Sequence, residues 1–544
     1  GGWPLFHAGD TDISATVKAY YALKLTGDSP DAPHMERARD AVLGLGGAAR
    51  CNVFTRIMLA LFGQVPWRAV PVMLVQIILL PRWFPFHLSK VSYWTRTVLT
   101  PLLVLMAEKP QARNPKGVKI DELFTTPPFQ ERRYMVNSTG ALLGYMFLWL
   151  DRGMRLALTV FPNLWQRRAT DRAVKFVTER LDGEEGLGGI FPAMANAVMM
   201  FDTLGYEKDH PHFVQARNAV KNLVVIDGDR AYCQPCVSPV WDTALALHAL
   251  LETNHEEDAA AVKRATKWLR DHQILDIKGD WHDQRPGLRP GAWAFQYRNE
   301  YYPDTDDSSV VAMALDRADS DENRESVDRG VEWIIGMQCR NGGWGSFDAD
   351  NTLYYLNHIP FADHGALLDP PTEDVSARCI SLLAQRGHSA DHPAMATGID
   401  YLKRTQMDDG SWYGRWGTNY IYGTWSVLCA LNAVGEDPQA PYIRRAVEWL
   451  KSRQLEDGGW GEDCASYWPG REREVKGSAA SQTAWAMLGL MAMGEAQSDA
   501  VRRGVEYLLD APKNGSGWEE KFYNAVGFPR VFFLKYHGYS TYFP

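Results

Sequence analysis

Apolar positions recur along most of this 544-residue chain at the three- and four-residue spacing of amphipathic helices. From about residue 170 onward, short turns that contain glycine separate these segments, and similar helical units return every ~50–70 residues. We find no alternation of strands with helices and no glycine-rich phosphate loop. The pattern therefore predicts an all-α fold built from repeats.

The repeats share a helix with an aromatic residue, followed by the motif Gln-x-x-x-Gly-x-Trp. Clear copies of the motif are Gln338–Trp344, Gln406–Trp412 and Gln454–Trp460, and a decayed copy ends in Ser516-x-Trp518. Weaker copies are Trp268…Gln273…Trp281 and Phe176…Gly186-Leu187. In each unit the glycine permits a turn, and the glutamine can bond the backbone where the next helix starts. Such paired helices favour two concentric rings, an α/α barrel.

Three apolar runs interrupt the amphipathic pattern, and none reaches the ~20 residues that a membrane-spanning helix needs. The longest is Val70–Leu80, and the others are Thr97–Ala107 and Leu156–Phe161. Ordinary buried helices are one interpretation. The other is a surface that dips into one leaflet of a bilayer, with Trp165 and nearby arginines at the headgroups.

Charge and cysteine content exclude further classes of protein. The net charge is −9 without a long basic run, which excludes a typical nucleic-acid-binding protein. The seven cysteines indicate a reduced compartment, and the lone pair Cys233 and Cys236, with Pro235 between them, favours structural cysteines over a zinc site. The chain opens on Gly1 without methionine or signal peptide, so we expect a trimmed piece of a longer protein.

A cluster of acids stands where a loop meets a buried helix. Asp304, Asp306 and Asp307 lie within four residues, directly before the apolar run Val310–Leu315, and Asp307 or Ser308 is the expected N-cap. Like charges this close cannot all ionise, so at least one carboxyl should keep its proton at neutral pH. A buried carboxylic acid that is short of water can act as a strong acid.

Two plainer interpretations of the cluster stay open on these residues alone. An acidic helix start is most often a cap that interacts favourably with the helix dipole. A metal site is less consistent, because the acids are not spaced as DDxxD and no EF-hand glycine follows.

Taken together, the repeats and the D-x-D-D motif Asp304–Asp307 resemble class II triterpene cyclases, specifically bacterial squalene–hopene cyclases, over essentially the whole chain. Supporting stretches are Ser238–Thr243, Ala294–Gln296, Asn357–Phe361, Asp369–Asp374, Gly414–Gly417 and Gly527–Pro529. The resemblance implies two α/α barrel domains, residues 1–236 and 237–544, around a large apolar cavity. It implies proton-initiated cyclisation of squalene to hopene, with hopanol formed by water capture, and neither cofactor nor metal.

The resemblance also implies where such a protein works. It would attach to one leaflet as a monotopic protein on the cytoplasmic side of the bacterial inner membrane, and squalene would enter through an apolar channel. It leaves a homodimer open.

Residue roles follow from the same resemblance. Asp306 would be the proton donor with Asp304 and Asp307 as partners, and Asp374 and Arg378 would form the pair behind it. The implied substrate-binding residues are Trp241, Phe295, Phe361, Trp416, Tyr422, Phe528, Phe532, Tyr536 and Tyr539. Arg56 would belong to the polar end where the last cation loses its proton. Aromatic walls suit this chemistry, because their faces attract a carbocation without quenching it.

The chain departs from the family pattern at four positions. Arg378 replaces a histidine, and a permanent cation stabilises the conjugate base but cannot relay a proton. Leu187 replaces a repeat tryptophan, while Phe347 and His364 replace a tyrosine and a phenylalanine. We expect these changes to bear on the product ratio and not on the class.

Three other functions compete with squalene cyclisation. A protein prenyltransferase subunit shares α/α barrels but needs a zinc-binding set, which the spacing of Cys379 and the histidines does not provide. A non-catalytic barrel protein would have no use for the acid cluster. A class II cyclase of another linear isoprenoid would differ in cavity volume.

Overall fold

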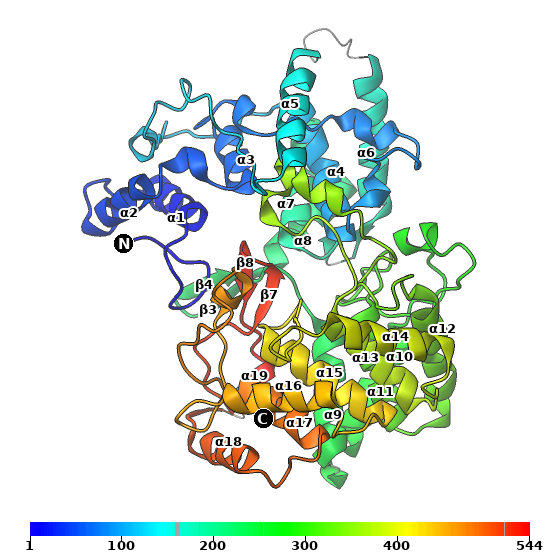
Figure 1. Cartoon of the computed structure of the whole chain (residues 1–544). Coiled ribbons are helices and arrows are strands. Elements are labelled where there is room, and N and C mark those ends of the chain that lie inside the picture. Colours follow the sequence, from blue (N-terminus) through cyan, green and yellow to red (C-terminus); the bar gives the residue numbers. More distant parts are fainter. Residues whose placement is uncertain (158–163, 184, 254, 516) are drawn as a thin grey trace.

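The computed structural model describes residues 1–157, 164–183, 185–253, 255–515 and 517–544, and it has two helical halves (Figure 1). The all-α prediction is confirmed, because the strands described form only two-stranded hairpins. The end of the predicted run Leu156–Phe161 and Ser516 of the decayed repeat lie outside the described residues. The upper half in the view contains α1 (Ile13–Thr26), α2 (Pro33–Gly44), α3 (Val53–Leu61), α4 (Tyr93–Glu108), α5 (Leu142–Ala157), α6 (Leu164–Glu179), α7 (Phe191–Thr203) and α8 (Pro211–Asn222).

The lower half holds the remaining helices. These are α9 (Pro239–Thr253), α10 (Ala259–Asp271), α11 (Thr305–Arg317), α12 (Arg324–Met337), α13 (Glu373–Gln385), α14 (Pro393–Thr405), α15 (Tyr420–Val434), α16 (Pro441–Ser452), α17 (Ala480–Ala492), α18 (Asp499–Asp510) and α19 (Tyr539–Tyr542). The strands are β1 (Leu181–Asp182), β2 (Gly186–Leu187), β3 (Val224–Asp227), β4 (Arg230–Cys233), β5 (Lys513–Asn514), β6 (Gly517–Trp518), β7 (Ala525–Phe528) and β8 (Phe532–Leu534). Each odd-numbered strand pairs antiparallel with the next, and β7 and β8 lie between the two halves (Figure 1).

Helices α9, α11, α13, α15 and α17 form an inner ring in the lower half. Each packs on the next, and α19 contacts both α17 and α9, which closes the ring. Helices α10, α12, α14, α16 and α18 pack outside them. Burial follows this order: α13 is buried nearly throughout, whereas α16 buries Ile443 and Val447 and exposes Arg445 and Glu448. The predicted concentric rings are therefore present in this half.

The repeat motif joins neighbouring helix pairs by hydrogen bonds. Gln454 donates through Nε2 to the carbonyl of Gly458 at 2.7 Å and to that of Ala500, in the next outer helix, at 2.8 Å. Trp460 is fully buried and donates through Nε1 to the carbonyl of Leu450 at 2.7 Å. The glycine has φ +88°, a left-handed conformation that a side chain would strain.

For one copy of the repeat, the tryptophan predicted from the sequence is wrong. Gln273 donates to the carbonyl of Gly291 at 2.7 Å, and Trp293 donates to the carbonyl of Leu269 at 2.7 Å. These bonds match those of Gln454 and Trp460, so Trp293 and not Trp281 completes this copy. The loop between Gln273 and Gly291 is longer than in the clear repeats, so this copy does not fit the Gln-x-x-x-Gly-x-Trp spacing.

The upper half packs around α4, which contacts α6 and α7 and is buried along almost its whole length. The buried-helix interpretation is therefore correct for Thr97–Ala107. Val70–Leu80 is different, since it forms only a short 3-10 helix, Val75–Leu79, against α4 and α6. The two halves have separate apolar cores, although residues 356–368 join the upper one. The boundary at residue 236 stays a prediction.

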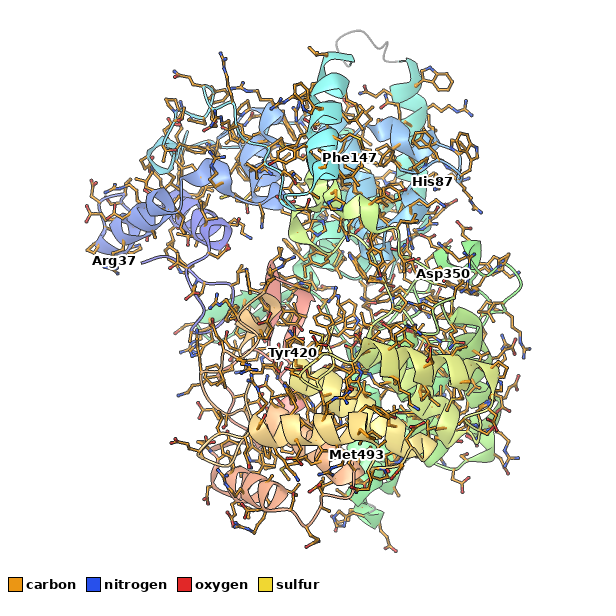
Figure 2. The ribbon with its side chains drawn as sticks, in the orientation of Figure 1. Arg37, His87, Phe147, Asp350, Tyr420 and Met493 are labelled. Carbon is orange, nitrogen blue, oxygen red and sulfur yellow. The ribbon has the colours of Figure 1, made fainter. Side chains whose placement is uncertain are left out.

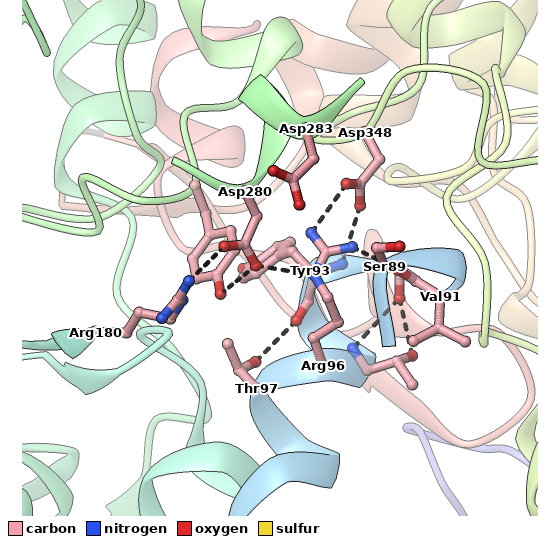
Figure 3. A network of polar contacts seen from close by, with 12 residues as sticks. Ser89, Val91, Tyr93, Arg96, Thr97, Arg180, Asp280, Asp283 and Asp348 are labelled. Carbon is pink, nitrogen blue, oxygen red and sulfur yellow. Dashed lines mark hydrogen bonds and ion pairs between the residues drawn. The ribbon is translucent and has the colours of Figure 1, made fainter. Parts of the chain in front are cut away.

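A buried polar network joins the two halves. Arg96 on α4 forms ion pairs with Asp280 at 3.0 Å and with Asp348 at 2.9 Å, and Arg180 also reaches Asp280 at 2.7 Å (Figure 3). Tyr302 donates its hydroxyl to Asp280 at 2.9 Å and stacks on Tyr93 with 4.6 Å between ring centroids. The network thus fixes the start of α4 against the loop that leads into Asp304.

Replacing the arginine at the centre of this network should loosen the junction. Arg96→Met leaves the buried carboxylate of Asp348 without its cation and removes one of the two arginines paired with Asp280. Breaking a buried ion pair costs about 3–5 kcal/mol. We expect a clearly lower melting temperature, measured by circular dichroism in detergent. Arg324→Met, which removes an exposed ion pair of α12 with Asp321, is the control and should change little. Equal stability of both variants would contradict the role of the network.

Candidate active site

An apolar cavity of about 900 Å³ lies between the two halves. Its walls come from the start of α4, the loop before α7, α9, the loop before α11, α15 and the β7–β8 hairpin. Eight of the nine residues predicted to bind substrate line it: Trp241, Phe295, Trp416, Tyr422, Phe528, Phe532, Tyr536 and Tyr539. The predicted acids Asp304, Asp306 and Asp307 line the same cavity. Residues from distant repeats therefore meet around one space.

Phe361 lies in a different place. It lines a second cavity of about 1510 Å³ in the upper half, bounded by α4, α5 and residues 71–91. His87 and Phe147, which also line it, lie in that half (Figure 2). Phe54 contacts both Phe361 and Phe528. Its ring centroid lies 5.9 Å from that of Phe361 and 6.4 Å from that of Phe528. Phe361 therefore belongs to a space next to the first cavity and not to its wall.

The helix start at the acid cluster differs from the prediction. Asp304, and not Asp307 or Ser308, is the N-cap of α11, because its Oδ1 accepts the N–H groups of Asp306 at 2.6 Å and Asp307 at 3.2 Å. The next two acids occupy the first turn of the helix, where their side chains are buried. Only Asp304 caps the helix, so capping does not explain the presence of Asp306 and Asp307.

Arg378 on α13 forms a two-pronged ion pair with Asp306. Its Nε donates to Asp306 Oδ1, and its Nη2 donates to Oδ2 at 2.8 Å. Its Nη1 donates to Ser426 Oγ at 3.0 Å. Its Cζ also lies over the ring of Trp241, 5.6 Å from the ring centroid, and over that of Tyr422, 5.0 Å from the centroid. Two residues of the cavity wall thus hold this cation.

Asp374 does not contact Arg378 in the way the prediction implied. Its Oδ2 accepts the backbone N–H of Arg415 at 2.9 Å and that of Trp416 at 3.1 Å, and its Oδ1 accepts the Thr372 hydroxyl at 2.7 Å. It is fully buried one helical turn before Arg378. The geometry gives Asp374 the task of fixing the loop that carries Trp416.

Burial raises the pKa of all three clustered acids, and repulsion within the cluster adds to the rise for Asp304 and Asp307. The pKa of Asp304 and that of Asp307 lie well above the ordinary value, because the groups are buried and neighbouring carboxylates disfavour their charge. Burial also raises the pKa of Asp306, but the Arg378 guanidinium opposes that rise. Asp306 is therefore the most acidic group of the three, and the other two hold protons more tightly.

The buried carboxyl of Asp307 should lower the free energy of unfolding at neutral pH. Its Oδ1 has no hydrogen-bond partner among the described residues, and its pKa is raised in the folded protein. The favourable contribution of such a group is present below the unfolded pKa and is lost as pH rises. We expect Asp307→Asn to raise the melting temperature at pH 7.5 and to lose that gain toward pH 4. A variant no more stable than wild type at pH 7.5 would contradict this charge assignment.

Sequence reasoning missed part of the cavity wall. Tyr93 and Trp94 line the cavity from the start of α4, and Gln296 and Cys236 line it from loops. The adjacent aromatic pair before an apolar helix was the only available signal. Phe347, noted earlier only as a departure, also lines this cavity.

Arg56, predicted at the polar end of the site, and His364, noted as a departure from the family pattern, both lie outside the lining of this cavity. Arg56 on α3 donates to the carbonyls of Ala69 and Tyr134 and reaches Asp363 at 3.4 Å. His364 is buried against Phe361 and Phe528, and burial lowers its pKa to about 4. The role of Arg56 at the end of the reaction stays a prediction.

Two further properties concern metals and membranes. Among the described residues, we find no group of three or more His, Cys, Asp or Glu side chains placed to hold a metal ion. None of the described helices is long and apolar enough to cross a membrane.

An α/α barrel with buried acids beside an aromatic cavity defines the class II terpene cyclases, and comparison with known proteins agrees. The squalene-hopene cyclase C-terminal domain model matches residues 237–544, and the N-terminal domain model matches residues 1–229. The chain therefore belongs to the squalene–hopene cyclase family.

Individual relatives are similar over the whole chain. A squalene–hopene cyclase of Zymomonas mobilis is 55% identical over 100% of this chain and 84% of its own length. One of Bradyrhizobium diazoefficiens is 54% identical, with 100% and 84% covered. One of Alicyclobacillus acidocaldarius is 40% identical, with 100% and 86% covered.

Proposed function

We propose that this protein cyclises squalene to hopene, and to hopanol where water captures the last cation. The observation that carries the proposal is the ion pair of Asp306 with Arg378 at the wall of an aromatic cavity of about 900 Å³. The family membership of the chain supports the same reaction. Asp306 is the initiating acid in this proposal.

Arg378 makes the first step possible. Proton transfer from Asp306 to a terminal alkene carbon leaves a carboxylate on the enzyme and a carbocation on the substrate. The guanidinium stabilises that carboxylate in a site without bulk water, which strengthens the acid. Asp304 and Asp307 lie at the same helix start, and their pKa values are raised well above the ordinary value, so they hold protons and can return one to Asp306.

The aromatic wall supports the later steps. Each ring closure moves positive charge along the substrate, and any nucleophile nearby would end the reaction early. Trp416, Phe528 and Phe532 present rings to the cavity. A desolvated cation–π contact contributes about 2 kcal/mol or more, so the wall favours cyclisation over early loss of a proton.

The proposal is tested by incubating the detergent-solubilised protein with squalene and analysing products by gas chromatography and mass spectrometry. We expect hopene as the main product and hopanol as the minor one. Absence of any cyclic product, from protein that is folded by circular dichroism, would refute it.

Membrane attachment is part of the proposal and is supported by exposed apolar side chains. On α5, Leu142 is 86% and Trp149 is 70% exposed, and Trp83 is 78% exposed in the loop before α4. Trp83, Phe84, Phe86 and Phe147 form a chain of ring contacts with centroids about 6 Å apart, which links that loop to α5.

Such exposure is unusual for a soluble surface and suits insertion into one leaflet. Leu150 on α5 is 47% exposed and also lines the second cavity, which therefore suits entry of squalene from the bilayer. The cytoplasmic location and the homodimer stay predictions.

Removing the exposed apolar side chains of α5 should weaken membrane binding. The double variant Leu142→Glu and Trp149→Glu loses apolar area and gains two charges at the surface proposed to enter the bilayer. We expect at least about tenfold less protein to sediment with phospholipid vesicles. Leu509→Glu, at a site 72% exposed on α18, is the matched control and should sediment as wild type does. Equal loss in both proteins would contradict the assigned surface.

A further inference from the structure

Trp416 forms hydrogen bonds through its main chain and through its ring. Its backbone N–H donates to Asp374 Oδ2 at 3.1 Å, and its carbonyl accepts the N–H of Val526 at 3.1 Å. These bonds place the main chain and leave the side-chain torsions to be set by other contacts. The indole N–H, the only hydrogen-bonding group of the ring, donates to Ser346 Oγ at 2.6 Å. Packing and this one hydrogen bond therefore orient the ring.

Ser346 lies on a loop that is itself firmly held. The loop follows α12, and Ser346 is only 2% exposed. Asp369 Oδ1 accepts the N–H of Ser346 at 3.1 Å, and its Oδ2 accepts the N–H groups of Phe347 at 2.7 Å and Asp348 at 2.9 Å. Asp348 also pairs with Arg96 in the network of Figure 3. Three successive N–H groups on one buried carboxylate limit the movement of the loop and of the Ser346 hydroxyl.

The same loop holds the start of the helix that carries the acids. Thr305, the first residue of α11, donates its N–H to the carbonyl of Ser346 at 2.7 Å and its hydroxyl to the carbonyl of Gly345 at 2.7 Å. Asp306 is the next residue of the helix. Ser346 therefore accepts one hydrogen bond from the helix start beside the proposed proton donor and another from the ring of Trp416.

The surroundings of the Trp416 ring show why its orientation matters. The ring lines the cavity together with Trp94 and Phe347, which meet it edge to face with ring centroids 5.8 and 6.4 Å away. Ser346 lies behind this wall and is not part of the cavity lining. A ring attracts a carbocation best when the cation lies over its face, within ~6 Å of the centroid. Without the Ser346 hydroxyl the indole N–H loses its acceptor, and we expect the ring to leave this orientation.

We propose that Ser346 is a positioning residue for cyclisation, whose hydroxyl holds the Trp416 ring with its face toward the cation that forms beside Asp306. The carbonyl of the same residue holds the start of α11, so the acid and the ring are fixed relative to one another. The role in cyclisation rests on the proposed function, whereas the hydrogen bond does not.

The role is tested by steady-state kinetics with squalene in detergent. Ser346→Ala should lower kcat about tenfold and leave KM nearly unchanged, because a turned ring stabilises the first cation less but binds neutral squalene equally well. The pH dependence of the rate should stay that of the wild type, since Asp306 keeps its ion pair with Arg378. An unchanged kcat, or a displaced pH profile, would overturn the proposal.

Two further variants separate the orientation of the ring from a general loss of stability. Thr483→Val on α17 also removes a buried hydroxyl, one that accepts the backbone N–H of Trp460 at 2.9 Å outside the cavity lining, and it should keep the wild-type kcat. Trp416→Phe has no indole N–H, so adding Ser346→Ala to it should change kcat little. An equal drop in that background, or the same drop in Thr483→Val, would contradict a role through the indole bond.

The hydrogen bond is tested without squalene. Protein labelled with fluorotryptophan is studied by fluorine NMR in detergent, and the signal lost in Trp416→Phe belongs to Trp416. We expect Ser346→Ala to move that signal and Thr483→Val to leave it in place, and an unmoved signal in Ser346→Ala would overturn the bond. If the wild type converts no squalene while Ser346→Ala still moves the signal, the bond stands and the proposed function fails.

Discussion

Asp306→Asn should abolish squalene conversion while leaving the protein folded. Asparagine has nearly the shape of aspartate and can still accept a hydrogen bond from Arg378, but it carries no proton acidic enough to transfer to an alkene. We expect a rate at least ~10³-fold lower, since general acid catalysis contributes about 10²–10⁴-fold and no other group in the cavity replaces it. Product formation over time, followed by gas chromatography, measures the effect.

The two neighbouring acids supply the controls for this variant. Asp304→Asn changes the N-cap of α11, and Asp307→Asn removes an acid without a partner for one oxygen, so each should keep measurable conversion. Near-normal conversion by Asp306→Asn, together with loss of conversion in either neighbour, would show that the donor is misassigned. Activity in all three variants would mean that the acid cluster serves only to cap the helix.

Arg378→Met should lower squalene conversion by about a hundredfold and move its pH dependence. Without the guanidinium, the pKa of Asp306 rises further and the acid becomes weaker, which slows protonation. Wild-type conversion should increase as pH falls, because the reactive form is the protonated one. In the variant, the higher pKa keeps Asp306 protonated to higher pH, so the decline of the rate should begin at higher pH. Initial rates measured from pH 4.5 to 8.5 test both effects.

Arg378→Lys separates charge from geometry. Lysine keeps the cation but cannot donate in parallel to both oxygens of Asp306, so its rate should fall between those of wild type and Arg378→Met. A Met variant with the wild-type rate would mean that the cation does not strengthen the acid.

The sequence predicted the fold class and most of the cavity because both rest on repeated, local signals. Gln454 and Trp460 mark the same hydrogen bonds in each clear repeat, and their spacing predicts the helix pairs. Asp304, Asp306 and Asp307 are adjacent, so their mutual repulsion follows from spacing alone.

Features that depend on distant contacts were not predictable in the same way. Trp293 replaced Trp281 in one repeat because a longer loop lies between glutamine and glycine. The partner of Asp306 is 72 residues away, and no pattern distinguishes a direct ion pair with Arg378 from a pair of Arg378 with Asp374. Phe361 lies in a separate cavity because residues 356–368 pack with the other half of the molecule.

The buried network around Arg96 has a consequence for when the protein becomes reactive. Tyr93 and Trp94 on one side and Tyr539 on the other complete the walls of the cavity, so its dry interior requires both halves to be folded and joined. Until then, Asp306 is an ordinary hydrated aspartate, ionised at neutral pH and unable to protonate an alkene. The protonated, reactive form of Asp306 at neutral pH is therefore created by the last stage of folding, and a partly folded chain does not carry it.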